Sequence, residues 1–243
     1  MTRPPVEMSI PCTQIELSPS PDIFLYMHDS PDVISAVRRA LGRTAPLATP
    51  PVPPDIEEPV SRLVHSEVGL PELMARVAAQ NKMGVTMTSP DELGEKLVEY
   101  VRSKGAKSIM LNVSPLLQQL GVAESLKKAG LSVRTWDEMA LDDAYECDCG
   151  ITDVWAAVAE VGGLVIRSSP EHGRILSLVP PLHIAIVEPK NLLPDLVDLF
   201  RKMPADQNDK FVIITGPSKT ADIEMQLVTG VHGPGVEQVF LLQ

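Results

Sequence analysis

The side chains best suited to binding an anion lie near the end of the chain, in Gly216-Pro-Ser-Lys-Thr220. An apolar run typical of a buried strand, 211–214, precedes this stretch, and a helix is expected to follow it. Ser218, Lys219 and Thr220 would then place hydroxyls and an ammonium at a helix N-terminus, where anions bind readily. The stretch differs from a nucleotide-binding P-loop because Ser218 stands where that motif requires glycine. We interpret these residues as ligands of a small anion; a capped helix with a solvated lysine is the alternative.

Two other side chains could take part in catalysis. His232 lies in Gly230-Val-His-Gly-Pro-Gly235, whose glycines allow a sharp turn at the rim of a sheet, and an imidazole can act as acid or base near neutral pH. Glu160 begins Glu160-Val-Gly-Gly163 and precedes a predicted buried strand, so its carboxylate could be partly desolvated and reactive. We predict both as catalytic residues. The alternatives are a histidine that only bonds a carbonyl and a glutamate on a solvated hairpin.

The segment after Glu160 is expected to form a hairpin with polar side chains. Its strands would be 164–167 and 174–179. Some of its residues could bring positive charge and hydroxyl groups to one pocket: Arg167, Ser168, His172, Arg174 and Ser177. Among these we select Ser168 and Arg174 as ligand-binding residues. An exposed hairpin with alternating polar side chains is the alternative.

The cysteines and histidines do not predict a metal site. Cys147-Asp-Cys149 supplies two thiols, whereas a zinc or iron-sulfur site normally needs four ligands. The five histidines show no metal-ligand spacing. We expect two reduced surface thiols, and neither a metal nor another cofactor in this chain. Three cysteines in total do not make a disulfide framework, so we expect a reducing, cytoplasmic compartment.

Composition excludes several classes of function. With 44% apolar residues, the 243-residue chain can bury a substantial core. A formal net charge of −11 argues against nucleic acid as a partner, although a local basic pocket for a small anion remains compatible with it. No stretch approaches the roughly 20 apolar residues that span a bilayer, so no membrane span is expected.

The chain is predicted to consist of an extension, 1–59, and an α/β domain, 60–243. The extension contains a short amphipathic helix, 32–43, and a linker, 44–59, with six prolines. In the domain, Ser89-Pro-Asp-Glu92 is typical of a helix start, and that helix should end near Gly105. Further segments are expected as follows: a helix from Leu70; strands at 108–113, 131–136 and 182–187, with helical segments between the first two; a short helix within 150–163; and a helix at 192–203.

The last part of the chain, 211–242, is expected to be a strand, a helix closed by Gly230 and a second strand, 236–242. Such a unit fits a right-handed crossover in a parallel sheet. The alternation of strands and helices predicts an α/β three-layer sandwich with a mostly parallel sheet.

Several of these motifs resemble the LUD domain of lactate-utilisation proteins. The residues that carry the resemblance are Thr215 to Glu224, Gly230 to Pro234, Ser168-Ser-Pro170 and Ser177 to His183. Glu160-Val-Gly-Gly163 is similar to the family's Glu-Thr-Gly-Thr turn, from which Val161 and Gly163 depart. The resemblance covers about residues 70 to 243 and implies a fold similar to that of sugar isomerases, CoA-transferases and formyltetrahydrofolate cyclo-ligase.

The resemblance also implies a function. The expected role is that of an accessory subunit in the oxidation of L-lactate to pyruvate, alongside iron-sulfur partner proteins that hold the redox centres, with a small anion bound in this chain. One alternative is an enzyme of acyl or CoA transfer that uses Glu160 as nucleophile or base. Another is a non-catalytic assembly or regulatory protein.

Overall fold

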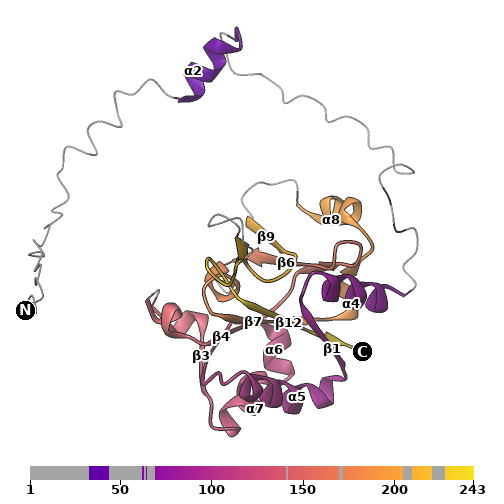
Figure 1. The fold of residues 1–243 in the computed structure, drawn as a ribbon, viewed down its shortest axis with the longest axis vertical. Helices are drawn as coiled ribbons and strands as arrows, with labels where there is room; N and C mark the ends of the chain where they lie inside the picture. The colour runs from indigo at the N-terminus through magenta and orange to yellow at the C-terminus, as the bar shows by residue number, and fades with distance from the viewer. Residues whose placement is uncertain are drawn as a thin grey trace, which may run out of the picture. The chain divides into compact units, whose positions relative to one another are not determined.

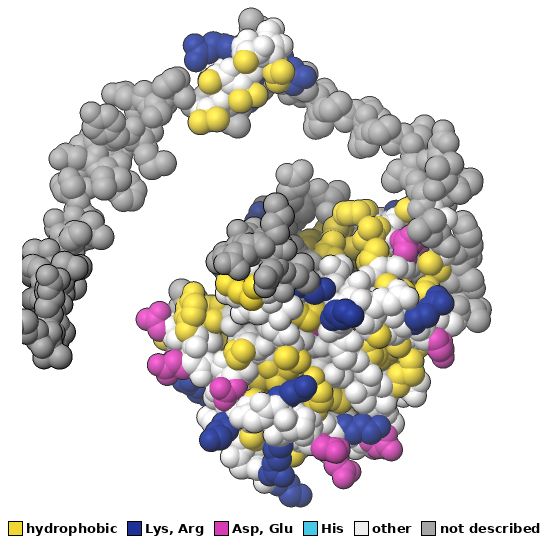
Figure 2. Space-filling model, in the orientation of Figure 1, with side chains coloured by type: hydrophobic (Ala, Val, Ile, Leu, Met, Phe, Trp, Pro, Cys, Tyr) yellow, Lys and Arg dark blue, Asp and Glu magenta, His cyan; other side chains and the backbone are white. Residues whose placement is uncertain are grey.

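The computed structural model describes residues 33–43, 62, 64, 69–140, 142–169, 172–204, 210–220 and 228–243. The chain divides into two units, 1–55 and 56–243, each described by itself. The predicted boundary at residue 59 and the proline-rich linker lie outside the described residues. In the first unit, α2 (Val33–Ala40) confirms the predicted helix. Val33 and Val37 of this helix are exposed, and hydrophobic side chains lie beside basic ones here (Figure 2).

A six-stranded parallel sheet forms the centre of the second unit (Figure 1). Its strands, in spatial order, are β1 (Gly84–Thr88), β12 (Val236–Leu242), β7 (Leu182–Val187), β4 (Cys149–Asp153), β2 (Ser108–Leu111) and β3 (Ser132–Thr135). All neighbouring pairs are parallel. The nearly continuous apolar sequences of β7 and β12 suit strands that are covered on both faces.

Helices α5 (Pro90–Ser103), α6 (Pro115–Gln119) and α7 (Val122–Lys128) cover one face of this sheet. The predicted start of α5 is confirmed, because the Ser89 side chain accepts a hydrogen bond from the Glu92 amide. Gly105, with φ of 73°, follows its last turn. Leu93, Leu97 and Val101 of α5 are completely buried against the strands.

The other face packs against a second, four-stranded sheet and α4 (Leu70–Gln80). Helix α8 (Leu196–Lys202) packs on the opposite face of this second sheet. The order of its strands is β8 (Leu192–Leu193), β5 (Ala156–Val158), β6 (Gly163–Ser168) and β9 (Lys210–Ile214). The short 3₁₀ helices are η1 (Trp136–Glu138), η2 (Asp142–Glu146), η3 (Arg174–Ser177) and η4 (Pro189–Asn191). The predicted α/β three-layer architecture with a mostly parallel sheet is therefore confirmed, and one outer layer contains a second sheet.

Three predicted elements before residue 204 are wrong. The expected short helix within 150–163 is β5, which pairs with both β6 and β8. The expected hairpin does not form, because β6 pairs with β5 and β9, and 174–177 is η3. The helix predicted from residue 192 begins only after Asp195, because 192–193 pairs with β5 as β8.

The prediction for 211–242 is also wrong in two respects. β9 and β12 lie in different sheets, so they are not joined by a crossover within one sheet. A helix from Ser218 to Gly230 is contradicted at both of its described ends, where β10 (Lys219–Thr220) pairs antiparallel with β11 (Val228–Thr229). The Gly230 amide donates to the Ser218 carbonyl at 2.9 Å, which is cross-strand rather than helical bonding. Residues 221–227 lie outside the described residues.

Cys147 and Cys149 are free, as predicted, but they are buried rather than on the surface. Burial raises the pKa of both thiols.

Within the described parts of the chain, no helix is long and apolar enough to cross a membrane.

Arg62 joins the segment before α4 to the first turn of α8. Its guanidinium donates to Asp195 at 3.0 Å and to Asp198 at 2.7 Å, and the Asp195 side chain caps α8. The hydrogen bond from Arg62 holds the pKa of Asp198 below its usual value.

We expect Arg62→Leu to lower the free energy of unfolding by about 1–3 kcal/mol in chemical denaturation. Arg201, exposed and 3.9 Å from the same carboxylate, is the control: Arg201→Ala should change it by less than about 0.5 kcal/mol. Equal effects would contradict the prediction.

Candidate functional site

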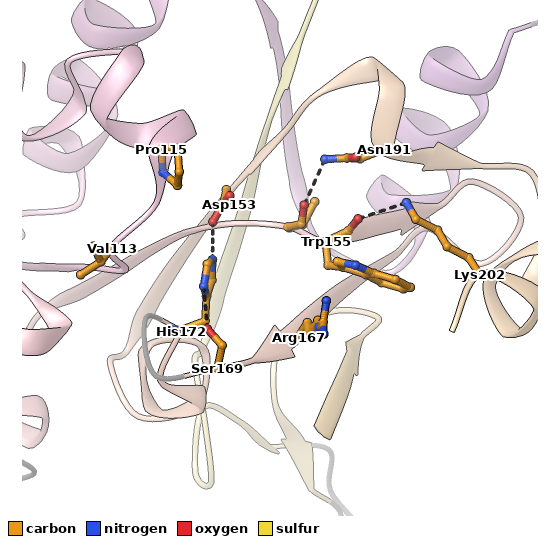
Figure 3. A pocket seen from close by; sticks show the side chains of 10 residues that line it. Val113, Pro115, Asp153, Trp155, Arg167, Ser169, His172, Asn191 and Lys202 are labelled. Atoms are coloured by element: carbon orange, nitrogen blue, oxygen red, sulfur yellow. Dashed lines mark hydrogen bonds and ion pairs between the residues drawn. The ribbon is translucent and has the colours of Figure 1, made fainter. Parts of the chain in front are cut away.

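A cavity of about 670 Å³ lies beyond the carboxyl ends of β2 and β4 (Figure 3). From the end of β2 the chain passes through α6 and α7 to β3, on one side of β2. From the end of β4 it passes through the second sheet to β7, on the opposite side. Ligands of open α/β sheets bind where connections diverge in this way. The lining residues are Val113, Pro115, Asp153, Val154, Trp155, Arg167, Ser169, His172, Asn191 and Lys202.

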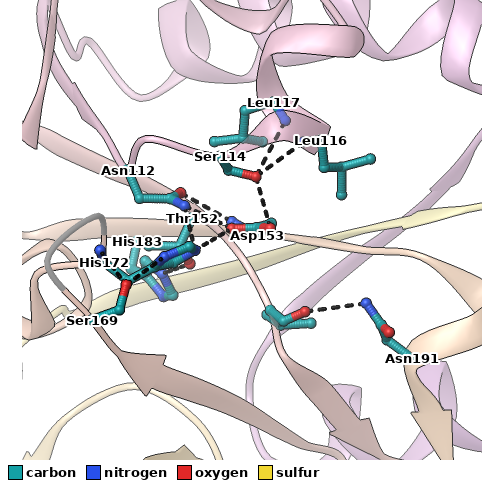
Figure 4. Close-up of polar contacts among 11 residues, drawn as sticks. Asn112, Ser114, Leu116, Leu117, Thr152, Asp153, Ser169, His172, His183 and Asn191 are labelled. Carbon is teal, nitrogen blue, oxygen red and sulfur yellow. Dashed lines mark hydrogen bonds and ion pairs between the residues drawn. The ribbon is translucent and has the colours of Figure 1, made fainter.

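Asp153, the last residue of β4, is the centre of the hydrogen bonds at this site (Figure 4). Its carboxylate accepts from Asn112 Nδ2 at 2.7 Å and from Ser114 Oγ at 2.8 Å, and its Oδ1 lies 2.8 Å from His172 Nε2. Asn112 follows β2, Ser114 caps α6, and His172 lies between β6 and η3. Three separate segments therefore meet at one carboxylate.

The environment of Asp153 favours the ionised form. Burial alone would raise its pKa, but hydrogen bonds with His172, Ser114 and Asn112 and the charge of His172 outweigh burial and lower it.

Asp153 should therefore contribute stability that depends on pH. Its pKa in the folded protein lies below the unfolded value of about 3.9, so the contribution is complete above that pH and is lost as the pH falls through the folded pKa. We expect the difference in free energy of unfolding between wild type and Asp153→Asn to shrink below about pH 4. Urea titrations from pH 7 to pH 3 measure it, with the exposed Asp137→Asn as control. A difference that is constant over this range would refute the assignment.

Cationic and apolar groups form the remaining wall. Lys202 Nζ lies 4.8 Å from the centre of the Trp155 ring and 3.4 Å from the Trp155 carbonyl oxygen. Partial burial lowers the pKa of Lys202. Arg167 lies on β6, and Asn191 Nδ2 donates to the Val154 carbonyl at 3.2 Å. The lining therefore combines the Asp153 carboxylate with the cationic side chains of Arg167 and Lys202 and with apolar groups.

A model of the LUD domain matches residues 70–242. The chain belongs to the LUD-domain family. It is 30% identical to lactate utilization protein C of Halalkalibacterium halodurans, over 70% of this chain and 77% of the relative. The corresponding protein of Bacillus licheniformis is 29% identical, over 86% of this chain and 93% of the relative. A crystal structure of a DUF162 family protein from Deinococcus radiodurans shares the fold, with a TM-score of 0.53 and 17% identity, over 74% of this chain and 99% of that one.

The LUD domain brings the motif 216–220 and the motif 230–235 together, and the residues described as lining the cavity include none from either motif. The Ser218 amide donates to the Pro234 carbonyl at 2.8 Å, so the turn that carries His232 packs on the turn before β10. Lys219 is exposed and donates to the Asn81 carbonyl at 3.4 Å, and His232 is exposed. Thr220 is half-buried on β10. The roles of Ser218, Lys219, Thr220 and His232 remain predictions.

Glu160 lies in the turn between β5 and β6 of the LUD domain. Its amide donates to the Pro194 carbonyl at 3.0 Å, and its side chain is half-buried. Gly162 has φ of 59°, and a Cβ there would lie 2.5 Å from the Ala78 backbone nitrogen of α4. The glycine turn therefore has a packing role. Glu160 does not belong to the described cavity lining, and its catalytic role remains a prediction.

The hairpin candidates are divided by the structure. Arg167 and His172 line the cavity, whereas Ser168 ends β6 opposite Lys210, and Arg174 is exposed at the start of η3. Ser177 is buried and donates to the Arg174 carbonyl. Sequence reasoning missed several lining residues of the LUD domain: Asp153, Trp155, Ser169, Asn191 and Lys202. A usable signal for Asp153 was a carboxylate at the end of the short strand β4.

Proposed function

We propose that this LUD-domain protein is a component of a lactate-utilisation system and that its cavity binds a small carboxylate anion. The role in lactate use is supported by the relatives named lactate utilization protein C. The binding proposal rests on one observation, a cavity at a sheet switch point in which Arg167 and Lys202 accompany apolar groups. The two cations would hold the carboxylate, and Trp155 would contact the carbon chain.

The finer part of the proposal concerns partners. We propose that the protein acts as an accessory subunit when L-lactate is oxidised to pyruvate, and that iron-sulfur partner proteins hold the redox centres. The two described cysteines support this, because burial raises their pKa and disfavours the thiolates that ligate clusters.

Growth on L-lactate tests the role, and a binding titration tests the cavity. A strain that lacks the gene should not grow on L-lactate, and the wild-type gene should restore growth. In calorimetric titrations with L-lactate and with pyruvate, Arg167→Ala and Lys202→Ala should each weaken binding about tenfold. Lys127→Ala, which removes an exposed lysine at the end of α7, is the matched control.

The outcomes separate the two parts of the proposal. Normal growth of the deletion strain would refute the role in lactate use. If Lys219→Ala abolishes anion binding while Lys202→Ala does not, the anion site lies at the turn before β10 and at β10 itself instead of in the cavity.

A further inference from the structure

The Asp153 carboxylate presents the cavity with an acceptor that the protein does not fill completely (Figure 4). An ionised carboxylate accepts about four hydrogen bonds and donates none. Its Oδ1 accepts from Asn112 Nδ2 at 2.7 Å and lies 2.8 Å from His172 Nε2. Its Oδ2 accepts from Ser114 Oγ at 2.8 Å and, among the described residues, has an acceptor position left. The Asp153 side chain is 20% exposed, so a ligand in the cavity can reach this carboxylate.

Two neighbours fix Asp153 as an acceptor, whichever nitrogen of His172 carries a proton. Asn112 Oδ1 accepts the Asp153 amide at 3.2 Å, which turns the Asn112 amino group toward the carboxylate. Ser114 Oγ accepts the Leu116 amide at 3.2 Å, so its own proton is directed to Asp153 Oδ2. A proton on the carboxylate would oppose one of these donors. The lowered pKa of Asp153, caused by its hydrogen bonds, agrees with this arrangement.

The two sides of the cavity differ in charge (Figure 3). Asp153 lies on one side, whereas Lys202 lies on the other, with its Nζ 4.8 Å from the centre of the Trp155 ring. Arg167 adds a second cationic side chain to the lining. A ligand that is complementary to this cavity therefore carries a negative charge and also a hydrogen-bond donor.

We propose that Asp153 determines the specificity of the cavity by accepting a hydrogen bond from the hydroxyl group of a hydroxycarboxylate, so that the corresponding keto acid binds less tightly. This inference rests on the proposed binding of a small carboxylate in this cavity. A keto oxygen has lone pairs and no proton, so it cannot pair with an ionised carboxylate. An ammonium group in place of the hydroxyl would be repelled by Arg167 and Lys202 in the same lining.

Such a preference has a direction in an oxidation. A component that binds L-lactate more tightly than pyruvate retains the reduced acid and releases the oxidised one. Asp153 exchanges neither a proton nor electrons with the ligand in this role, so it determines specificity and is not a catalytic residue.

Calorimetric titration of the purified full-length protein at pH 7 tests the proposal with L-lactate, pyruvate and (S)-2-fluoropropionate. The fluorine of the last compound is close to a hydroxyl in size and donates no hydrogen bond. L-Lactate should bind at least about tenfold more tightly than either of the others. Size does not explain such a difference, because a cavity of about 670 Å³ accommodates all three acids.

The variant Asp153→Asn should remove the preference, because its amide can donate to a keto oxygen. L-Lactate and pyruvate should then bind within about threefold of each other, which is close in free energy. The matched control is Asp91→Asn, which makes the same change at an exposed position in the first turn of α5 and should keep the wild-type preference. Thermal unfolding midpoints show whether each variant folds.

A crystal structure of the wild-type protein with L-lactate tests the contact without any variant. The ligand hydroxyl should lie within about 3 Å of an Asp153 carboxylate oxygen, and a hydroxyl placed elsewhere would overturn the proposal. Equal affinities of the wild type for L-lactate and fluoropropionate, an unchanged preference in folded Asp153→Asn, or tighter binding of L-alanine than of L-lactate would also overturn it. In these cases the carboxylates still bind, and the proposed function stands. If none of the carboxylates binds, the proposed anion site fails as well.

Discussion

Replacing either member of the buried His183–Glu237 pair is expected to destabilise the protein by about 3–5 kcal/mol. The two residues are directly opposite each other in the register of β7 and β12, and His183 Nδ1 lies 2.7 Å from Glu237 Oε2. The other ring nitrogen lies 2.9 Å from Thr152 Oγ1 of β4. All three residues are at most 2% exposed. Loss of one partner therefore leaves a polar or charged group in the centre of the sheet without compensation.

A double-mutant cycle tests this pair. His183→Leu and Glu237→Leu should each show the full loss in urea unfolding, whereas the double variant should lose clearly less than the sum, because no unpaired charge remains. The exposed Lys96–Glu92 pair of α5 is the control and should show a coupling of only about 0.3–0.5 kcal/mol. Additive losses at His183 and Glu237 would contradict the prediction.

Gly150→Ala is expected to destabilise the protein by about 3 kcal/mol or more, which exceeds the usual cost of one added methyl group. A Cβ on Gly150 of β4 would lie 1.9 Å from the carbonyl oxygen of Leu176 in η3. Since that neighbour is backbone, η3 itself would have to move. His172 lies just before η3, so the variant should also weaken the contacts of Asp153 with His172.

Thermal and urea unfolding measure the loss, and the histidine resonances of an NMR spectrum report on His172. Gly235→Ala is the matched control, because a Cβ there would make an ordinary contact of 3.4 Å with the Gly230 Cα. It should change the free energy of unfolding by less than about 1 kcal/mol. Similar losses in both variants would show that η3 does not press on β4.

Local rules predicted the parts of the fold that have a local cause. The Ser89 cap, the stop at Gly105 and the apolar runs of β2 and β7 follow from neighbouring residues. The errors occurred where pairing with distant strands decides the structure. Ala156–Val158 is a short apolar run that fits either a helix or a strand, and only its pairing with β6 and β8 makes it β5. Whether β9 joins the six-stranded or the four-stranded sheet cannot be read from its own sequence either.

The same reason limited the prediction of the site. Arg167 and His172 were recognised as candidates because their own segment is polar. Asp153 and Asn112 are 41 positions apart in sequence, and only the pairing of β2 with β4 brings them into contact. Lys202 reaches the cavity because α8 packs beside Trp155, which a single sequence does not reveal. The turns that carry Ser218 and His232 pack on each other, which the local sequence of neither turn reveals.

The position of β12 has a consequence for how the protein is made. β12 comes last in sequence order, yet it lies between β1 and β7. During synthesis, β2, β3, β4 and β7 can pair with one another, whereas β1 gains its strand neighbour only when β12 is present. Thr86 of β1 accepts a hydrogen bond from the side chain of Gln238 of β12, which lies 152 positions later in the sequence, so this bond can form only after Gln238 has been synthesised. Pairing over such distances is slow and leaves strand edges open to other chains. The newly made chain should therefore depend on chaperones until β12 is inserted.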